Sequence, residues 1–198
     1  MVSALADLRV CVIDMDGEMR RRVREELAGM GISQVRECAD PSMALILLSE
    51  FDADFCIVDW MGENMDGLAF VRFIRTHEDS PNPGLPIIMM TENANTQRVI
   101  DARNAGVDEF LAKPINGRAL HSRLLSLVEN PRLFIRSEAY SGPDRRRSNR
   151  PFVGEDRRNR GRDVDTPIEA VPPKRTKRPA KKRVAAKRRQ EKSPVALC

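Results

Sequence analysis

Hydrophobic residues between positions 8 and 129 fall into short continuous runs that alternate with segments of helical spacing. The continuous runs predict strands buried on both faces, at residues 8–13, 35–39, 55–58, 86–91 and 109–113. The intervening segments repeat apolar positions every three or four residues and predict amphipathic helices at 18–30, 41–49, 67–76, 95–105 and 117–129. Arg36 and Glu37 make the second strand the weakest of the five.

This alternation of strand and helix, repeated with short loops, predicts a doubly wound parallel α/β sheet with helices on both faces. In such a sheet the carboxyl ends of all strands share one edge, and ligands bind there. That edge would collect a small set of polar side chains: Asp14 and Asp16 after the first strand, Asp59 after the third, Thr91 after the fourth and Lys113 after the fifth. We therefore expect one site at this edge.

The residue types at this edge favour phosphoryl chemistry. Two or three converging carboxylates repel each other unless a hard cation such as Mg²⁺ lies among them. A carboxylate can also attack phosphorus and form an acyl phosphate. The Thr91 hydroxyl and the Lys113 ammonium are suited to stabilising the oxygens of a transferring phosphoryl group.

Charge divides the chain near Pro131. Residues 1–130 hold 13 Lys and Arg against 21 Asp and Glu, a net charge of −8, whereas residues 131–198 have a net charge of +13. Residues 131–171 are rich in Pro, Gly and charge, which predicts a disordered linker. Gly-x-Asp-Arg-Arg occurs twice in it, starting at Gly142 and Gly154. The repeat is either a coincidence in a tether or a paired linear motif for a protein partner or for the acidic half.

Residues 172–198 form a Lys/Arg-rich tail. Eleven Lys and Arg lie within 172–192 beside a single acid, Glu191, and no aromatic residue. This composition suits non-specific, salt-dependent contact with nucleic-acid phosphates, although a solvated tail without that role is the alternative. No apolar run approaches the ~20 residues of a membrane span, and no signal peptide precedes the first strand, so we expect a soluble, cytoplasmic protein.

Residues 8 to about 129 resemble the receiver domain of bacterial two-component response regulators, and are similar throughout to the stand-alone chemotaxis regulators. The motifs that carry the resemblance are Val12-Ile13-Asp14, Asp59-Trp60, Asn64-Met65-Asp66-Gly67, Thr91 and Lys113-Pro114. It implies a receiver domain over 1–130 with a flavodoxin-like five-stranded sheet, strand order 2-1-3-4-5, and five helices. It also implies a cis peptide bond between Lys113 and Pro114.

The same resemblance implies roles for individual residues. Asp59 would accept a phosphoryl group from a histidine kinase, a phosphotransfer protein or a small donor, and Lys113 would contact that group. Thr91 and Phe110 would rearrange in response and change the surface offered to a downstream protein target. Self-phosphorylation and dephosphorylation at Asp59 would be the only catalysis, because no folded output domain is expected after residue 130.

One position departs from the family pattern. Receivers usually carry two adjacent acids after the first strand, and the second is a direct metal ligand, but Met15 stands there in this chain. We expect weaker Mg²⁺ binding by Asp14, Asp59 and the backbone carbonyl of Met61, with Asp16 as a substitute ligand. Two alternatives stay open: a degenerate receiver acting as a constitutive docking module, and a nucleic-acid-associated protein working through its tail.

Overall fold

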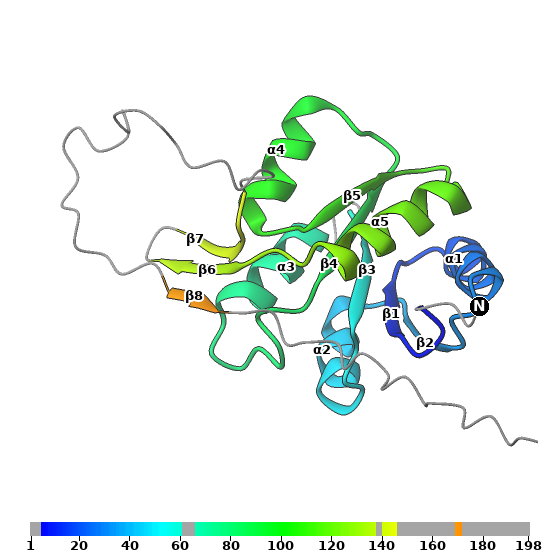
Figure 1. Cartoon of the computed structure of the whole chain (residues 1–198), viewed down its shortest axis with the longest axis horizontal. Helices are drawn as coiled ribbons and strands as arrows, with labels where there is room; N and C mark the ends of the chain where they lie inside the picture. The colour runs from blue at the N-terminus through cyan, green and yellow to red at the C-terminus, as the bar shows by residue number, and fades with distance from the viewer. Residues whose placement is uncertain (1–4, 61–65, 138–139, 146–168, 172–198) are drawn as a thin grey trace, which may run out of the picture.

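The computed structural model describes residues 5–60, 66–137 and 140–145 and the backbone of 169–171. Strands and helices alternate as β1 (Arg9–Ile13), α1 (Gly17–Gly29), β2 (Gln34–Cys38), α2 (Pro41–Glu50), β3 (Phe55–Asp59), α3 (Gly67–Thr76), β4 (Ile87–Thr91), α4 (Thr96–Ala105), β5 (Glu109–Ala112) and α5 (Gly117–Glu129). The strands are parallel, in the order β2-β1-β3-β4-β5 (Figure 1). The predicted five-stranded doubly wound fold is confirmed.

Two apolar layers hold the helices against the sheet. On one face, α1 and α5 bury Val23, Leu27, Leu120 and Leu124 among others against Val10, Val12, Ile57 and Ile88 of the strands. On the other, α2, α3 and α4 bury Ala44, Leu48, Val71, Ile74 and Ala102 against Cys11, Val58, Ile87 and Met89. β1, β3 and β4 are therefore covered on both sides, whereas β2 is a partly exposed edge strand, which explains how it accommodates charged residues.

Each of the five helices begins at an Asp or Asn whose side chain accepts a backbone N–H of the first turn. These N-caps are Asp16, Asp40, Asp66, Asn95 and Asn116. Each helix follows the carboxyl end of a strand, so the caps lie at the edge where the candidate residues were expected. Each of these side chains is therefore already engaged in a hydrogen bond that caps its helix.

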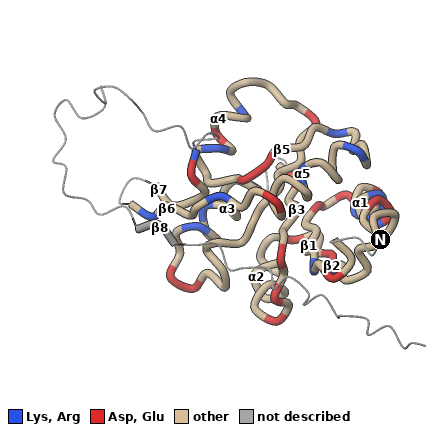
Figure 2. The backbone as a smooth tube through the Cα atoms, in the orientation of Figure 1, with Lys and Arg blue, Asp and Glu red and all other residues tan. Residues whose placement is uncertain are grey.

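Lys or Arg and Asp or Glu lie interleaved along α1 (Figure 2). Arg24 Nη1 lies 2.6 Å from Glu37 Oε1 on β2, and Arg21 Nη2 lies 2.8 Å from Glu18 Oε2 on its own helix. Arg20 Nε lies 3.7 Å from Glu37 Oε2. Glu37 therefore ties α1 to the edge strand through two arginines.

The structure differs from the prediction of a disordered linker from residue 131 onward. β6 (Phe134–Ser137) and β7 (Tyr140–Pro143) form an antiparallel hairpin, and β8 (Glu169–Val171) pairs with the other edge of β6. Figure 1 shows this small sheet beside α3, away from α1. Residues 146–168, including the second Gly-x-Asp-Arg-Arg, and the basic tail 172–198 lie outside the described residues.

The hairpin packs on a buried arginine. Arg75, in the last turn of α3, is 1% exposed and donates to Gly106 O at 2.9 Å, Pro83 O at 2.6 Å, Leu85 O at 2.7 Å and Asp108 Oδ2 at 2.9 Å. Ser141 Oγ donates to Arg75 O at 2.7 Å, and the Phe134 ring lies 5.7 Å from the guanidinium carbon. The hairpin therefore packs on a surface that α3 and its buried arginine provide.

Glycines permit a close approach between the hairpin and the end of α4. A Cβ on Gly106, whose φ is 95°, would lie 3.0 Å from Ser141 O, and a Cβ on Gly142 would lie 2.9 Å from Gly106 Cα. Gly142 belongs to the first Gly-x-Asp-Arg-Arg copy, so part of that motif serves packing. Among the described residues, no helix has the length and apolar character needed to span a bilayer.

Candidate functional site

Strand register brings the predicted acids together. Ile13 of β1 lies opposite Val58 of β3, so the residues that follow them, Asp14 and Asp59, end adjacent strands at the same level. Thr91 ends β4 opposite Ala112 of β5, and the next residue is Lys113. The Lys113 N–H donates to Thr91 O at 2.7 Å, which continues the β4–β5 pairing to the edge of the sheet.

Lys113 bridges the two carboxylates. Its Nζ lies 2.8 Å from Asp14 Oδ2 and 2.8 Å from Asp59 Oδ1. The Asp14 side chain is 1% exposed, the Lys113 side chain 7% and the Asp59 side chain 16%. The Lys113–Pro114 peptide bond is cis, as the resemblance to receiver domains implies. Asp59 is thus the most accessible member of this charged group.

Burial and charge act in opposite directions on the pKa values here. Burial raises the pKa of Asp14 above its ordinary value, more than the hydrogen bond from Lys113 lowers it. Burial by itself would lower the pKa of Lys113, but hydrogen bonds to Asp14 and Asp59 outweigh it and raise that pKa. Lys113 therefore remains a cation held between two acids.

Met15 is exposed, and Asp16 contacts Asp14 through its backbone N–H, which donates to Asp14 Oδ1 at 2.9 Å. The Met15 side chain is 57% exposed, and Asp16 Oδ1 accepts the Glu18 N–H at 2.9 Å as the α1 cap. Within residues 5–60, 66–137 and 140–145, no three His, Cys, Asp or Glu side chains gather as metal ligands. Asp16 Oδ1 is thus engaged as the α1 cap, and its expected role as a substitute ligand stays a prediction. Arg20 Nη1 instead donates to Asp14 O at 2.6 Å and Met15 O at 3.2 Å.

Asp14 and Asp59 fit a Mg²⁺ site with two protein carboxylates. Both offer oxygen ligands at the end of adjacent strands and both already contact one cation, the Lys113 ammonium. The third predicted ligand, the Met61 carbonyl, lies outside the described residues. The weaker metal binding expected from Met15 stays a prediction.

The Thr91 hydroxyl contacts Arg98, a residue that the sequence analysis did not identify. Arg98 Nη1, from α4, donates to Thr91 Oγ1 at 3.1 Å, and the Arg98 guanidinium carbon lies 4.9 Å from the centroid of the Trp60 ring. Phe110, the predicted second switch residue, is half-buried in β5 and packs against the core beneath α3 and α4. Thr91 and Phe110 thus lie on the neighbouring strands β4 and β5, and Arg98 joins Thr91 to α4.

Gly67 has a positional role that the motif only hinted at. A Cβ at this position would collide with the carbonyl oxygen of Asp59 and lie 3.1 Å from Trp60 O. The Gly67 N–H donates to Trp60 O at 3.1 Å. The start of α3 therefore rests directly on the backbone of the proposed acceptor, and only a residue without a side chain fits there.

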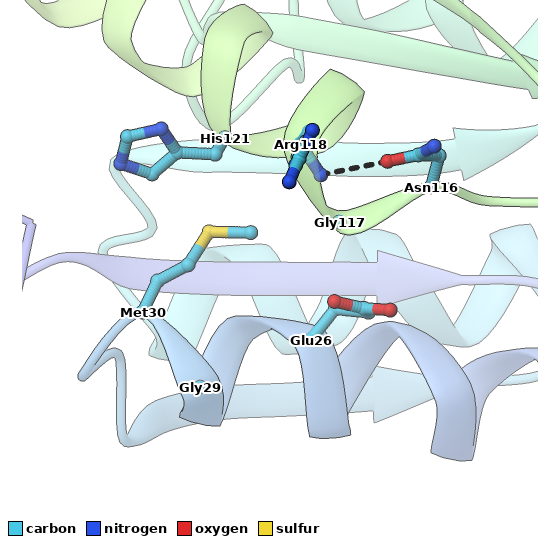
Figure 3. A pocket seen from close by; sticks show the side chains of 7 residues that line it. All are labelled: Glu26, Gly29, Met30, Asn116, Gly117, Arg118 and His121. Carbon is cyan, nitrogen blue, oxygen red and sulfur yellow. Dashed lines mark hydrogen bonds between the residues drawn. The ribbon is translucent and has the colours of Figure 1, made fainter.

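A separate open pocket of about 630 Å³ lies between α1 and α5. Figure 3 shows Glu26 and Met30 of α1 facing Asn116, Gly117 and His121 at the start of α5. The Glu26 carboxylate lies against Gly117, where the N–H groups of the first turn of α5 favour negative charge. The residues that line this pocket include neither Asp14 nor Asp59 nor Lys113.

A comparison with protein families matches residues 10–125 to the response regulator receiver domain. The match covers more than half of the chain. The chain belongs to the response regulator receiver family.

Relatives and solved structures agree with this assignment. The chain is 30% identical over 123 residues to the chemotaxis protein CheY-3 of Vibrio cholerae, covering 62% of this chain and 93% of the relative. It is 28% identical to the chemotaxis protein CheY of Pseudomonas aeruginosa over 122 residues, which are 62% of this chain and 97% of that protein. The structure of Vibrio cholerae CheY4 superposes with a TM-score of 0.54 at 26% identity, covering 59% of this chain and 95% of CheY4.

Proposed function

We propose that this protein is a phosphorylation-controlled response regulator that accepts a phosphoryl group on Asp59. The observation that carries the proposal is the placement of Lys113 Nζ at 2.8 Å from both Asp14 and Asp59. Such a constellation holds a carboxylate nucleophile beside a cation that can neutralise incoming phosphoryl oxygens. A histidine kinase or a phosphotransfer protein would supply the phosphoryl group in the cell.

Each residue has a chemical role in this proposal. A carboxylate oxygen of Asp59 forms a bond to phosphorus while the bond from phosphorus to the donor breaks. Lys113 donates to an oxygen of the transferred group, and the Thr91 hydroxyl donates to another. When bound by Asp14, Asp59 and the Met61 carbonyl, Mg²⁺ would neutralise further charge on the phosphoryl oxygens.

The output of the proposed switch is a change of surface. Arg98 joins Thr91 to α4, and Phe110 lies on the adjacent strand β5, so a shift of Thr91 towards a phosphoryl oxygen is relayed to the surface that α4 and β5 present. A protein target that binds only one form of this surface would read the signal. Self-phosphorylation and dephosphorylation at Asp59 are the only catalysis that the proposal includes.

The test is phosphorylation by a small acyl phosphate, read by intact mass with and without Mg²⁺. Wild type is expected to gain one phosphoryl group in a Mg²⁺-dependent manner. Asp59→Asn is expected to gain none, because an amide is not a nucleophile for phosphorus. Uptake by the Asp59→Asn variant at the wild-type rate contradicts the site. No uptake by wild type at high Mg²⁺ favours a constitutive docking module.

A further inference from the structure

Arg98 of α4 contacts Thr91 and Trp60, which lie at the carboxyl ends of β4 and β3. Its Nη1 donates to Thr91 Oγ1 at 3.1 Å, and its guanidinium carbon lies 4.9 Å from the Trp60 ring centroid. Trp60 directly follows Asp59 in the chain. One side chain thus contacts both the hydroxyl expected to meet the phosphoryl group and the residue next to the acceptor.

The hydrogen bonds around Thr91 define what its hydroxyl can do. A threonine hydroxyl has one hydrogen to donate and two lone pairs that accept. The Asn93 N–H, at 3.2 Å, and Arg98 Nη1, at 3.1 Å, both donate to this oxygen. The hydroxyl's own contact is the Asn93 carbonyl at 3.4 Å, a long distance for an O–H···O hydrogen bond. The oxygen is therefore saturated as an acceptor and its hydrogen is weakly engaged.

We propose that Arg98 is a positioning residue for phosphoryl transfer, acting through Thr91. It keeps the Thr91 hydroxyl oriented as a donor and brings a second cation, besides Lys113, to the edge of the sheet. This inference rests on the proposed function, because it assigns the preorganised donor to the phosphoryl oxygens. Stacking on Trp60 holds the guanidinium in place, since a planar cation over an aromatic face is favourable.

Arg98 neither forms nor breaks a bond in the chemical step. With an acyl phosphate donor, a carboxylate oxygen of Asp59 forms the new bond to phosphorus. The bond between phosphorus and the donor's carboxylate oxygen breaks, and that carboxylate leaves with the electron pair. No proton has to move, so Arg98 contributes orientation and charge only.

Two substitutions and a matched control on the same helix test the inference. Arg98→Gln removes the charge, Arg98→Lys keeps it without the planar fork, and Arg103→Gln removes an exposed charge of the last turn of α4. We expect Arg98→Gln to slow uptake from acetyl phosphate roughly tenfold, less than removing a direct oxyanion donor does. Arg98→Lys should restore part of the rate, and Arg103→Gln should match wild type.

The same Arg98 substitution in a protein that lacks the Thr91 hydroxyl distinguishes a positioning role from a general effect of charge. In a Thr91→Ala protein, the Arg98→Gln substitution should change the uptake rate by much less than it does in wild type, because the hydroxyl that Arg98 orients is gone. An equal loss in both backgrounds would overturn the route through Thr91. Since Trp60 is the sole tryptophan, its emission should also differ between Arg98→Gln and Arg103→Gln before any donor is added.

The outcomes distinguish the two proposals. Absence of uptake by wild type overturns the proposed function and this inference together. Uptake by wild type, with Arg98→Gln as fast as Arg103→Gln, overturns the inference alone. Thermal unfolding of each variant shows whether its fold is intact, and if Arg98→Gln does not fold, the comparison of Arg98→Lys with wild type decides.

Discussion

Lys113 Nζ donates to Asp14 Oδ2 at 2.8 Å although 99 positions separate the two residues in the chain. The contact closes the site across β1, β3 and β5, because the same ammonium also reaches Asp59. Nearly buried acids that share one cation depend on it strongly, since an unpaired charge away from water is unfavourable.

We therefore expect Lys113→Met to lower both activity and stability. Phosphoryl uptake should fall about a hundredfold or more, and the free energy of unfolding without Mg²⁺ should fall by about 3 kcal/mol. Urea denaturation measures the second effect. Arg118→Met, which removes an exposed cation nearby, is the control and should unfold like wild type. If adding Asp14→Asn to Lys113→Met restores no stability, carboxylate repulsion is not the cause.

Met15→Asp should strengthen Mg²⁺ binding, because it adds a carboxylate beside Asp14. We expect the dissociation constant to fall about tenfold, the equivalent of ~1.4 kcal/mol. Titration of Trp60 emission with Mg²⁺ measures it. The control is Met43→Asp on α2, whose side chain is 55% exposed against 57% for Met15. Equal affinities for both variants would show that position 15 does not face the metal.

Gly67→Ala should disrupt the acceptor itself. The new Cβ would collide with the Asp59 carbonyl, and backbone cannot give way as a flexible side chain can. We expect a loss of about 2 kcal/mol or more in unfolding free energy, together with slower phosphoryl uptake. Gly29→Ala, where a Cβ meets nothing within 4 Å, is the matched control. A Gly67→Ala protein as stable and as active as wild type would contradict the close approach.

Arg75→Met should loosen the hairpin from the receiver. It leaves the carboxylate of Asp108, whose side chain is 10% exposed, without its cation, and removes donors to three carbonyls. We expect a loss of about 3–5 kcal/mol in unfolding free energy. Arg72→Met, an exposed position of the same helix, should lose little. Faster proteolysis within 131–145 of the Arg75→Met protein alone would confirm that the hairpin is released.

Tyr140, the sole tyrosine, offers a pH test of the same docking. Burial raises the pKa of its phenol above the ordinary 10.0, more than the neighbouring Arg145 lowers it. The folded protein thus keeps this proton longer than the unfolded chain does. The corresponding stability is present in full below pH 10.0 and is lost as the pH rises towards the folded-state pKa.

Tyrosinate absorbance measures this pKa directly. We expect the native protein to titrate at higher pH than the same protein in denaturant, and Arg145→Gln to titrate higher still. Identical titrations for the native and denatured protein would mean that Tyr140 is not enclosed.

The sequence predicted the receiver well because its signals are local. Buried runs such as 55–58 define the strands, and the carboxyl-edge rule then brings Asp14, Asp59 and Lys113 together without any knowledge of contacts. Arg75 and Arg98 were missed for the opposite reason. Each occupies an ordinary helical position for a surface arginine, and only the folded chain shows that loop carbonyls surround one and that the other meets Thr91.

The hairpin was missed because its apolar content is judged too low when the segment is considered alone. The segment has few large apolar residues such as Phe134 and Tyr140, and Pro, Gly and charged residues surround them. What stabilises them is a surface of α3 and of the turn before β5, where Gly106 leaves room for Ser141. A pattern within one segment does not reveal the surface that another segment offers.

The positions of Trp60 and Tyr140 allow the distance between the hairpin and the carboxyl end of β3 to be followed by fluorescence. Trp60 follows the carboxyl end of β3, whereas Tyr140 packs near Gly106, before the amino end of β5. A strand length of roughly 13–17 Å separates the two ends. Because the chain has one tyrosine and one tryptophan, fluorescence energy transfer from tyrosine to tryptophan can only run from Tyr140 to Trp60. Movement of the hairpin relative to the edge of the sheet that holds Asp59 can therefore be followed in the unlabelled, unmutated protein.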